Sequence, residues 1–233
     1  MKILTVVSNY NESSALLETI DDIKKNSTIK TDILVIDNSS YNDSLHIIKS
    51  SSVNYLVHPV NTGGSAGVIK TALLYAYYHG YDIYCHMDGD NQHVAEELSK
   101  IVHPISKNEA DFVLGSRFLT KEGFQSHFFR RIGINLFSFI VSKIIHNKLT
   151  DITSGFRAYN KKAIEYFAIK YKHEIEASVQ MPLIASFAGL RISEVPVIMR
   201  PRTTGKSEIN LVNALKFPIF GAVSLIGTLL QKH

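Results

Sequence analysis

The chain has 233 residues, which suits one large domain or two small ones and is enough to bury a core without disulfides or metal ions. Hydrophobic residues make up 45% of the sequence and charged residues 20%, a balance that excludes an intrinsically disordered chain. The single cysteine, Cys85, excludes an internal disulfide framework and a zinc-finger cluster. We expect Cys85 to be a buried thiol in a reducing compartment.

The net charge is +4, which is too small to indicate a nucleic-acid partner. From Arg191 to the C-terminus there are six basic and two acidic residues, so this segment alone carries a net charge of +4. A basic C-terminal segment indicates an anionic ligand or surface near it. The apolar run in Met1–Val7 is too short for a signal peptide, and we interpret it as the first strand of a cytoplasmic domain.

The first half of the chain alternates short apolar runs with segments of helical length. Continuous apolar strands separated by helices predict a doubly wound α/β fold, with a mostly parallel sheet flanked by helices. Ligands of such folds bind beyond the carboxyl ends of the strands. The expected strands are Ile3–Val7, Ile33–Ile36, Tyr55–Val57, Ile83–Cys85 and Phe112–Leu114, and the expected helices are Ser14–Lys25, Asp43–Ser50, Ser65–Tyr78 and Ala95–Ser106.

The second half contains two long apolar segments, Phe128–Ile145 and Leu211–Leu230, which we expect to be helices. Between Lys216 and Lys232 lie fifteen residues without charge. A transmembrane helix needs about 20 apolar residues, so this stretch better fits an interfacial helix or a core helix. We therefore expect a domain over residues 1–210, followed by an apolar, basic-flanked helix over 211–233 that associates with a membrane or forms an oligomer.

Two carboxylates follow the expected strand Ile83–Cys85, in the sequence Asp88-Gly89-Asp90-Asn91-Gln92-His93. Across a turn, Asp88 and Asp90 can converge on one hard cation, and Mg²⁺ and Mn²⁺ prefer such oxygen ligands. The alternative is a solvated turn. An EF-hand is excluded, because Gln92 and His93 stand where its loop needs an oxygen ligand and a glycine.

A glycine-rich loop, Asn61–Ser65, precedes the expected helix Ser65–Tyr78. It is not a P-loop, because that motif needs a lysine directly after its second glycine, and Lys70 comes after Val68 and Ile69. The loop either brings a helix N-terminus close to a phosphate or is only a tight turn that lets the helix pack on the sheet.

Seven short motifs occur along most of the chain. They occupy residues 6–12, 35–40, 61–64, 88–93, 115–118, 151–157, and 194–197 together with 202–207. Each motif is weak by itself, but the order of all seven is specific. Taken together and in this order, they resemble those of family 2 glycosyltransferases with the GT-A fold, and in particular the branch of dolichyl-phosphate mannose synthase and bacterial polyprenyl-phosphate sugar transferases.

The resemblance implies a nucleotide-sugar donor and Mg²⁺ or Mn²⁺ as cofactor. Tyr10 would lie against the nucleobase, Asp37 would accept a hydrogen bond from it, and Glu12 would face the ribose. The metal would be held on the diphosphate by Asp88, Asp90 and Gln92. The full set of implied catalytic residues is Asp88, Asp90, Arg117 and Arg202, and that of donor-binding residues is Ser8, Tyr10, Glu12, Val35, Asp37, Gly89, Arg131 and Lys206.

General chemistry agrees with these roles. A leaving nucleoside diphosphate develops negative charge, which a metal ion and a set of Arg and Lys side chains stabilise. For any one of the arginines, a surface salt bridge is the alternative. Two positions depart from the family pattern: Ser8 replaces a common proline, and Asn38 replaces a frequent second aspartate.

A phosphate acceptor needs no general base, whereas an alcohol acceptor does. Glu174 and Glu176 are the carboxylates best suited to that role, but acids at a helix start, which interact favourably with the helix dipole, are the better explanation of them. The expected activity is inverting transfer of a sugar to a polyprenyl phosphate or lipid-linked glycan in cell-envelope polysaccharide synthesis, on the inner face of the cell membrane. The alternative is a non-catalytic nucleotide-binding module that recruits a partner at the membrane. A homo-oligomer is a further possibility.

Overall fold

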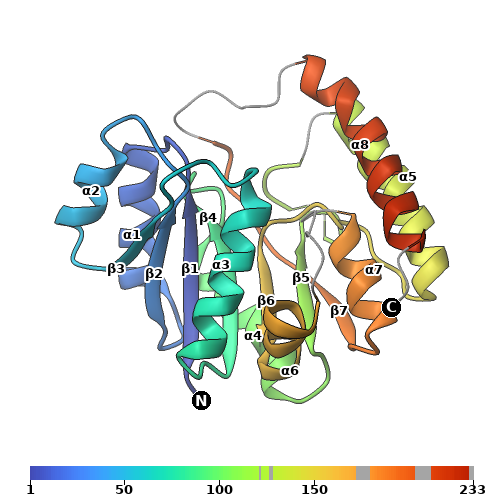
Figure 1. Ribbon diagram of the computed structural model, residues 1–233, viewed down its shortest axis with the longest axis horizontal. Coiled ribbons are helices and arrows are strands. Elements are labelled where there is room, and N and C mark those ends of the chain that lie inside the picture. Colours follow the sequence, from blue (N-terminus) through green and yellow to red (C-terminus); the bar gives the residue numbers. More distant parts are fainter. Residues whose placement is uncertain (121, 126–127, 172–178, 203–210, 231–233) are drawn as a thin grey trace.

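A seven-stranded sheet forms the centre of the molecule (Figure 1). The computed structural model describes residues 1–120, 122–125, 128–171, 179–202 and 211–230, without the side chains of 128–130 and 211–220. The strand order is β3-β2-β1-β4-β6-β5-β7, and only β6 runs antiparallel to its neighbours among the described strands. The strands are β1 (Ile3–Asn9), β2 (Asp32–Asp37), β3 (Asn54–Val57), β4 (Ile83–Asp88), β5 (Phe112–Ser116), β6 (Arg157–Asn160) and β7 (Ile192–Pro196).

Helices cover both faces of the sheet, and each strand sends alternate side chains to opposite faces. In β1, Leu4 and Val6 join the core beneath one helix layer, whereas Ile3 and Val7 join the core beneath the other. The first layer contains α3 (Ser65–Tyr78), α5 (Phe128–Ile145), α6 (Lys161–Glu165), a π-helical turn (Tyr166–Lys170) and α7 (Gln180–Phe187). The second contains α1 (Ser14–Asn26), α2 (Ser44–Ser50), a short 3₁₀ turn (Ala95–Glu97) and α4 (Leu98–Ser106).

The five predicted strands and the helices between them are present, and the predicted doubly wound α/β fold with a mostly parallel sheet is confirmed. Cys85 is fully buried, as expected. The structure contains two further strands, β6 and β7, which the sequence pattern did not predict. Strand β6 is antiparallel and lies between β4 and β5, so the parallel strands are divided into two groups.

The two long helices of the second half have the predicted bounds, Phe128–Ile145 for α5 and Leu211–Leu230 for α8. Helix α8 packs against α5 and α7, and α5 and α8 lie side by side (Figure 1). At Gly221 a Cβ atom would lie only 2.7 Å from the Phe137 ring, so a larger residue would require the ring or the helix to move. Within the described ranges, none of the helices combines the length and the hydropathy required to cross a bilayer.

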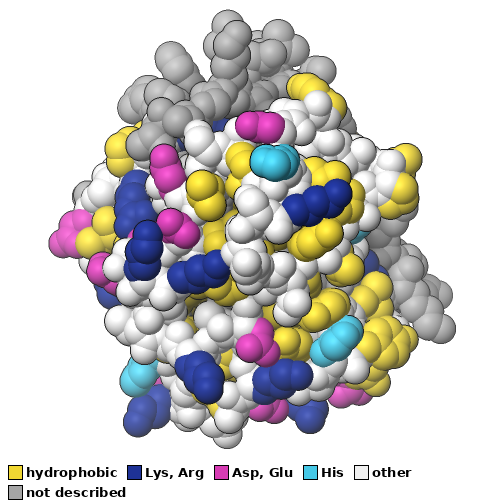
Figure 2. Space-filling model, turned by 90° about the vertical axis from the view of Figure 1, so that its left-hand side faces the viewer, with side chains coloured by type: hydrophobic (Ala, Val, Ile, Leu, Met, Phe, Trp, Pro, Cys, Tyr) yellow, Lys and Arg dark blue, Asp and Glu magenta, His cyan; other side chains and the backbone are white. Residues whose placement is uncertain are grey.

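The face of the molecule at the β3 edge carries acidic and basic side chains side by side (Figure 2). Charges of both signs are interspersed there, with apolar side chains between them, as on an ordinary solvated surface. The concentrated polar features lie instead at the carboxyl ends of the strands.

Candidate active site

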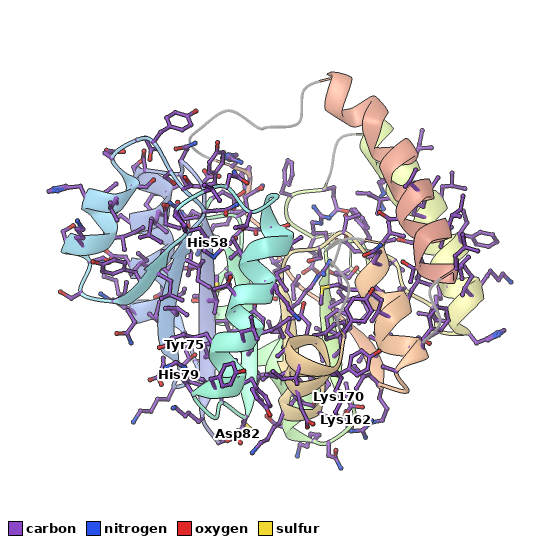
Figure 3. All side chains as sticks on the ribbon, viewed as in Figure 1. His58, Tyr75, His79, Asp82, Lys162 and Lys170 are labelled. Carbon is purple, nitrogen blue, oxygen red and sulfur yellow. The ribbon has the colours of Figure 1, made fainter. Side chains whose placement is uncertain are left out.

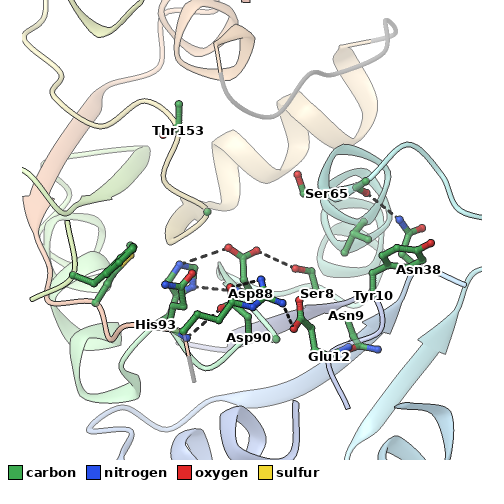
Figure 4. A pocket seen from close by; sticks show the side chains of 18 of the residues that line it. Ser8, Asn9, Tyr10, Glu12, Asn38, Ser65, Asp88, Asp90, His93 and Thr153 are labelled. Carbon is green, nitrogen blue, oxygen red and sulfur yellow. Dashed lines mark hydrogen bonds and ion pairs between the residues drawn. The ribbon is translucent and has the colours of Figure 1, made fainter. Parts of the chain in front are cut away.

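A cavity of about 740 Å³ opens at the carboxyl ends of β1, β2 and β4 (Figure 4). The parallel register places Ser8 beside Asp88 and Asn9 beside Asp37, because parallel strands end at the same edge of the sheet. Nine residues predicted from the sequence line this single cavity: Ser8, Tyr10, Glu12, Asp88, Gly89, Asp90, Gln92, Arg117 and Arg202.

The carboxylate of Asp88 lies at the end of β4 among three polar side chains. The Ser8 hydroxyl donates to Asp88 Oδ1 at 3.1 Å, and His93 Nε2 lies 3.7 Å from Oδ2. The Asp88 backbone N–H donates to His93 Nδ1, so the ring proton of neutral His93 is on Nε2 and points at the carboxylate (Figure 4). Burial lowers the pKa of His93 to about 4. Burial of Asp88 favours its neutral form, but His86, His93 and the Ser8 hydroxyl outweigh this effect and hold the pKa of Asp88 well below its usual value.

Asp90 lies close to Asp88 and is 9% exposed. Burial and the neighbouring charge of Asp88 raise the pKa of Asp90. Arg202 bridges Asp90 and Glu12: its Nη1 lies 3.6 Å from Asp90 Oδ2, and its Nη2 donates to Glu12. Residues 12, 90 and 202, which are far apart in the sequence, therefore meet at one side of the cavity.

Arg117 is 8% exposed and forms a two-point ion pair with the fully buried Asp151. The Nε and Nη2 atoms of Arg117 donate to the two Asp151 oxygens at 2.6 and 2.7 Å. Glu194 holds the same loop, because its carboxylate accepts from the backbone N–H groups of Thr150 and Asp151. Arg117 lines the cavity, but its guanidinium is paired with the Asp151 carboxylate. The alternative role considered for each arginine, a salt bridge, is therefore present here, although the pair is buried and not at the surface.

Asp37 does not line the cavity. It is 1% exposed, and its oxygens accept from the Asn9 side chain and from the backbone and hydroxyl of Ser40. These bonds fix the loops after β1 and β2. Asp37 therefore supports the loops of the site, and its predicted hydrogen bond to a base stays a prediction.

Asn38, which replaces the expected aspartate, does line the cavity. Its side chain joins the loop after β2 to the glycine-rich loop: the amide donates to Asn61 and Gly64, and the oxygen accepts from Thr62 and lies 3.0 Å from His58 Nδ1. In Figure 3, His58 lies toward the cavity end of the sheet, whereas Tyr75, His79, Asp82, Lys162 and Lys170 lie at the opposite end.

Two further predicted donor-binding residues, Val35 and Arg131, lie outside the cavity lining. Val35 is fully buried in the core, so its side chain does not reach the cavity. Arg131 does not line the cavity; it donates to Gln125 at 3.1 Å and lies over the Phe118 ring. Lys206, like Glu174 and Glu176, lies outside the described residues.

The structure identifies site residues that had not been assigned a role. His93 holds Asp88, and Asp151 holds Arg117. At Gly155 a Cβ atom would lie 2.5 Å from Asp88 Oδ2, so any other residue here would displace the Asp88 carboxylate or the loop. His93, Asp151 and Gly155 all lie within the family motifs at residues 88–93 and 151–157, but the sequence does not indicate which atoms they contact.

The described residues contain no group of three His, Cys, Asp or Glu side chains arranged as a complete metal site. The side chains present nevertheless fit a divalent cation whose remaining coordination positions are filled by phosphate oxygens of a substrate. Two carboxylates face one polar cavity, and the charge of Asp88 is one of the causes that raise the pKa of Asp90. A bound cation relieves such repulsion, and Mg²⁺ and Mn²⁺ accept oxygen ligands from substrate phosphates.

The arrangement of sheet, helices and cavity is that of a GT-A fold. Over the whole chain, the structure matches 80% of the crystal structure of glucosyl-3-phosphoglycerate synthase from Mycobacterium tuberculosis, with a TM-score of 0.70 and 14% sequence identity. That crystal structure contains Mn²⁺, uridine diphosphate and phosphoglyceric acid.

The sequence comparison defines the family. A model described as Glycosyl transferase family 2 matches residues 5–167, and the chain belongs to this family of glycosyltransferases. It is 28% identical over 219 residues to the undecaprenyl-phosphate mannosyltransferase of Micrococcus luteus, covering 90% of this chain and 88% of that protein. It is 25% identical over 214 residues to the UDP-N-acetylglucosamine–dolichyl-phosphate N-acetylglucosaminyltransferase of Methanococcus voltae, covering 84% of each.

Proposed function

We propose that this glycosyltransferase moves a sugar from a nucleoside diphosphate sugar to a polyprenyl phosphate, with inversion at the anomeric carbon. The observation that carries the proposal is the meeting of Asp88, Asp90 and Arg202 in one cavity beside Tyr10. The names of the relatives in Micrococcus luteus and Methanococcus voltae support a lipid phosphate acceptor. A lipid-linked glycan is the other acceptor class, and cell-envelope polysaccharide synthesis is the proposed context.

In this proposal the protein binds and orients the donor at the sheet edge. Tyr10 supplies an aromatic face for the nucleobase, and Asp88, Asp90 and Gln92 would hold Mg²⁺ or Mn²⁺. When bound, the metal ion stabilises the charge that develops on the departing diphosphate. Arg202, already paired with Glu12 and near Asp90, adds a second positive charge on the same side.

A phosphate acceptor is consistent with the carboxylates that line the described part of the cavity. The carboxylates that line the described cavity are Glu12, Asp88 and Asp90. Glu12 is paired with Arg202, and the other two form the candidate metal site. A lipid phosphate is already an anion at neutral pH, so its attack does not require a further carboxylate as general base.

The test is transfer from a panel of radiolabelled nucleotide-sugars to a short polyprenyl phosphate, with Mn²⁺ or Mg²⁺ present. We expect label in the organic phase with one donor, loss of the product with a chelator, and an inverted anomeric configuration by NMR. Binding of a nucleotide-sugar without transfer to any acceptor would contradict the proposal and favour a non-catalytic nucleotide-binding module.

We also propose that α5 and α8 form the membrane-facing surface, and that the protein is peripheral on the inner face of the membrane. Ile132, Leu136 and Phe139 are 52–61% exposed on α5, at the spacing of one helix face. On α8, Val223, Ile226, Leu229 and Leu230 are 49–78% exposed. The two helices pack on one another.

Helix α5 is also linked to the rim of the cavity. Gln125 accepts from Arg131 of α5 at 3.1 Å and donates to the Arg117 carbonyl at 2.8 Å. An apolar surface beside a cavity that contains Arg117, Arg202 and a candidate metal site suits a ligand that has an anionic head and a long apolar tail. The competing explanation is that these helices form a homo-oligomer interface.

Flotation with anionic liposomes tests the membrane proposal. We expect the full chain to float, and a chain ending at Asn210 to float much less. Phe139→Ser with Val223→Ser should weaken binding at least tenfold, because burying each apolar side chain contributes roughly 1.5–3 kcal/mol. Tyr78→Ser, at a 72% exposed position on α3, is the matched control and should float like the wild type. A full chain that stays in solution as a stable oligomer would contradict the proposal.

A further inference from the structure

His86 is a fully buried histidine that the proposed chemistry does not yet use. It lies on β4 two residues before Asp88 and two after Tyr84, so all three side chains leave the strand on the same face. That face is the one toward α3, because Tyr84 belongs to the core on that side, whereas Cys85 and Met87 belong to the core on the other side. The three residues therefore form a row from the core to the cavity.

One nitrogen of His86 is bonded and the other is not. Its Nδ1 lies 2.6 Å from the Tyr84 hydroxyl, which belongs to a ring stacked on Tyr159. Its Nε2 is buried, has no hydrogen-bond partner among the described residues and lies 3.7 Å from Asp88 Oδ1. A buried polar atom without a partner is costly, so its orientation toward the carboxylate calls for an explanation.

The tautomer follows from these neighbours. If Nδ1 carried the proton, the lone pair of Nε2 would face the Asp88 carboxylate, which is repulsive. If the Tyr84 hydroxyl donates to Nδ1, the proton is on Nε2 and points at Asp88 Oδ1. Asp88 is then approached by an N–H group on each side, from His86 at Oδ1 and from His93 at Oδ2, each at 3.7 Å.

We propose that His86 is a positioning residue for the metal site: held by Tyr84, it orients the Asp88 carboxylate for binding a divalent cation. The inference rests on the proposed function, because it takes Asp88 as a metal ligand. Polar groups around a ligating carboxylate fix its direction and tune metal affinity. At 3.7 Å the His86 N–H acts on Asp88 electrostatically and not through a short hydrogen bond. The Asp88 side chain is 39% exposed, so the contacts with His86 and His93 leave room for the cation on the cavity side.

The test is titration of the full chain with Mn²⁺, with free Mn²⁺ measured by electron paramagnetic resonance. We expect His86→Phe to weaken Mn²⁺ binding by about tenfold or more, the lower end of the effect of removing a supporting partner from a metal ligand. His86→Gln, which keeps an N–H donor, should recover most of the affinity. Tyr84→Phe removes only the hydroxyl and should weaken binding by a smaller factor.

Two controls separate this effect from a general loss of structure. Cys85→Ala changes a buried residue of the same strand on the opposite face and should bind Mn²⁺ like the wild type. Asp88→Asn should abolish binding. If His86→Phe and Tyr84→Phe both bind Mn²⁺ within twofold of the wild type while Asp88→Asn does not bind, the role of His86 is overturned and the proposed metal site stands. If the wild type binds millimolar Mn²⁺ neither alone nor with a nucleoside diphosphate present, both are overturned.

Discussion

Asp90→Asn should lower sugar transfer by at least a hundredfold, and Asp88→Asn should have nearly the same effect. Either change keeps the size of the side chain and removes one of the two cavity carboxylates proposed to hold the metal ion. Electrostatic groups aimed at developing charge contribute about a hundred- to a thousandfold each in enzymes of other classes. The measurement is the initial rate of transfer at saturating Mn²⁺.

The fold should survive the loss of the Asp90 charge. The pKa of Asp90 is raised in the folded chain, so folding disfavours its ionised form. The contribution of Asp90 to the free energy of unfolding therefore decreases as the pH rises from about 4 toward 7. Asp90→Asn without metal should therefore melt no lower than the wild type at pH 7. Asp82→Asn, at the opposite end of the sheet, is the matched control for activity. Near-normal turnover of Asp90→Asn with metal present would show that the metal assignment is wrong.

Asp151→Ala should destabilise the fold by about 3–5 kcal/mol, because it leaves the buried guanidinium of Arg117 without its carboxylate. Urea unfolding measures this change in free energy. Asp21→Ala removes a partner of the exposed pair Lys25–Asp21 and should cost no more than about 0.5 kcal/mol.

A double variant distinguishes the structural part of Arg117 from a part in catalysis. Asp151→Leu with Arg117→Met replaces the pair by apolar groups and should recover much of the lost stability, since a buried ion pair can often be exchanged in this way. If Arg117 also contacts phosphate, this stable double variant should still transfer sugar slowly. Full activity of the double variant would make Arg117 a purely structural residue.

The local pattern of the sequence determined the first half of the fold. Apolar runs such as Ile3–Val7 and Phe112–Leu114 are buried on both faces, so their strands can be recognised without knowing the neighbours. The polar loops that follow them must meet at one edge because the strands are parallel. The sequence therefore also predicted that Ser8, Asp88 and Asp90 share a cavity.

Tertiary structure alone decided the remaining elements of the sheet. Strand β6 has four residues and begins with Arg157, which is an unusual residue for a fully buried position. It is buried because its guanidinium donates to the carbonyls of Ser154 and Ile152 and to Met181. No run of apolar residues marks such a strand, and its antiparallel direction depends on the path of the chain around it.

The roles of individual polar side chains were decided in the same way. Asp37 and Arg117 carry the residue types expected of ligand contacts, but their partners, Asn9 and Asp151, lie 28 and 34 residues away in the sequence. Residue type and spacing predict that a charge lies near the cavity. Whether that charge faces the ligand or is neutralised from behind depends on distant segments, because burying a charge is favourable only where the fold supplies its counter-group.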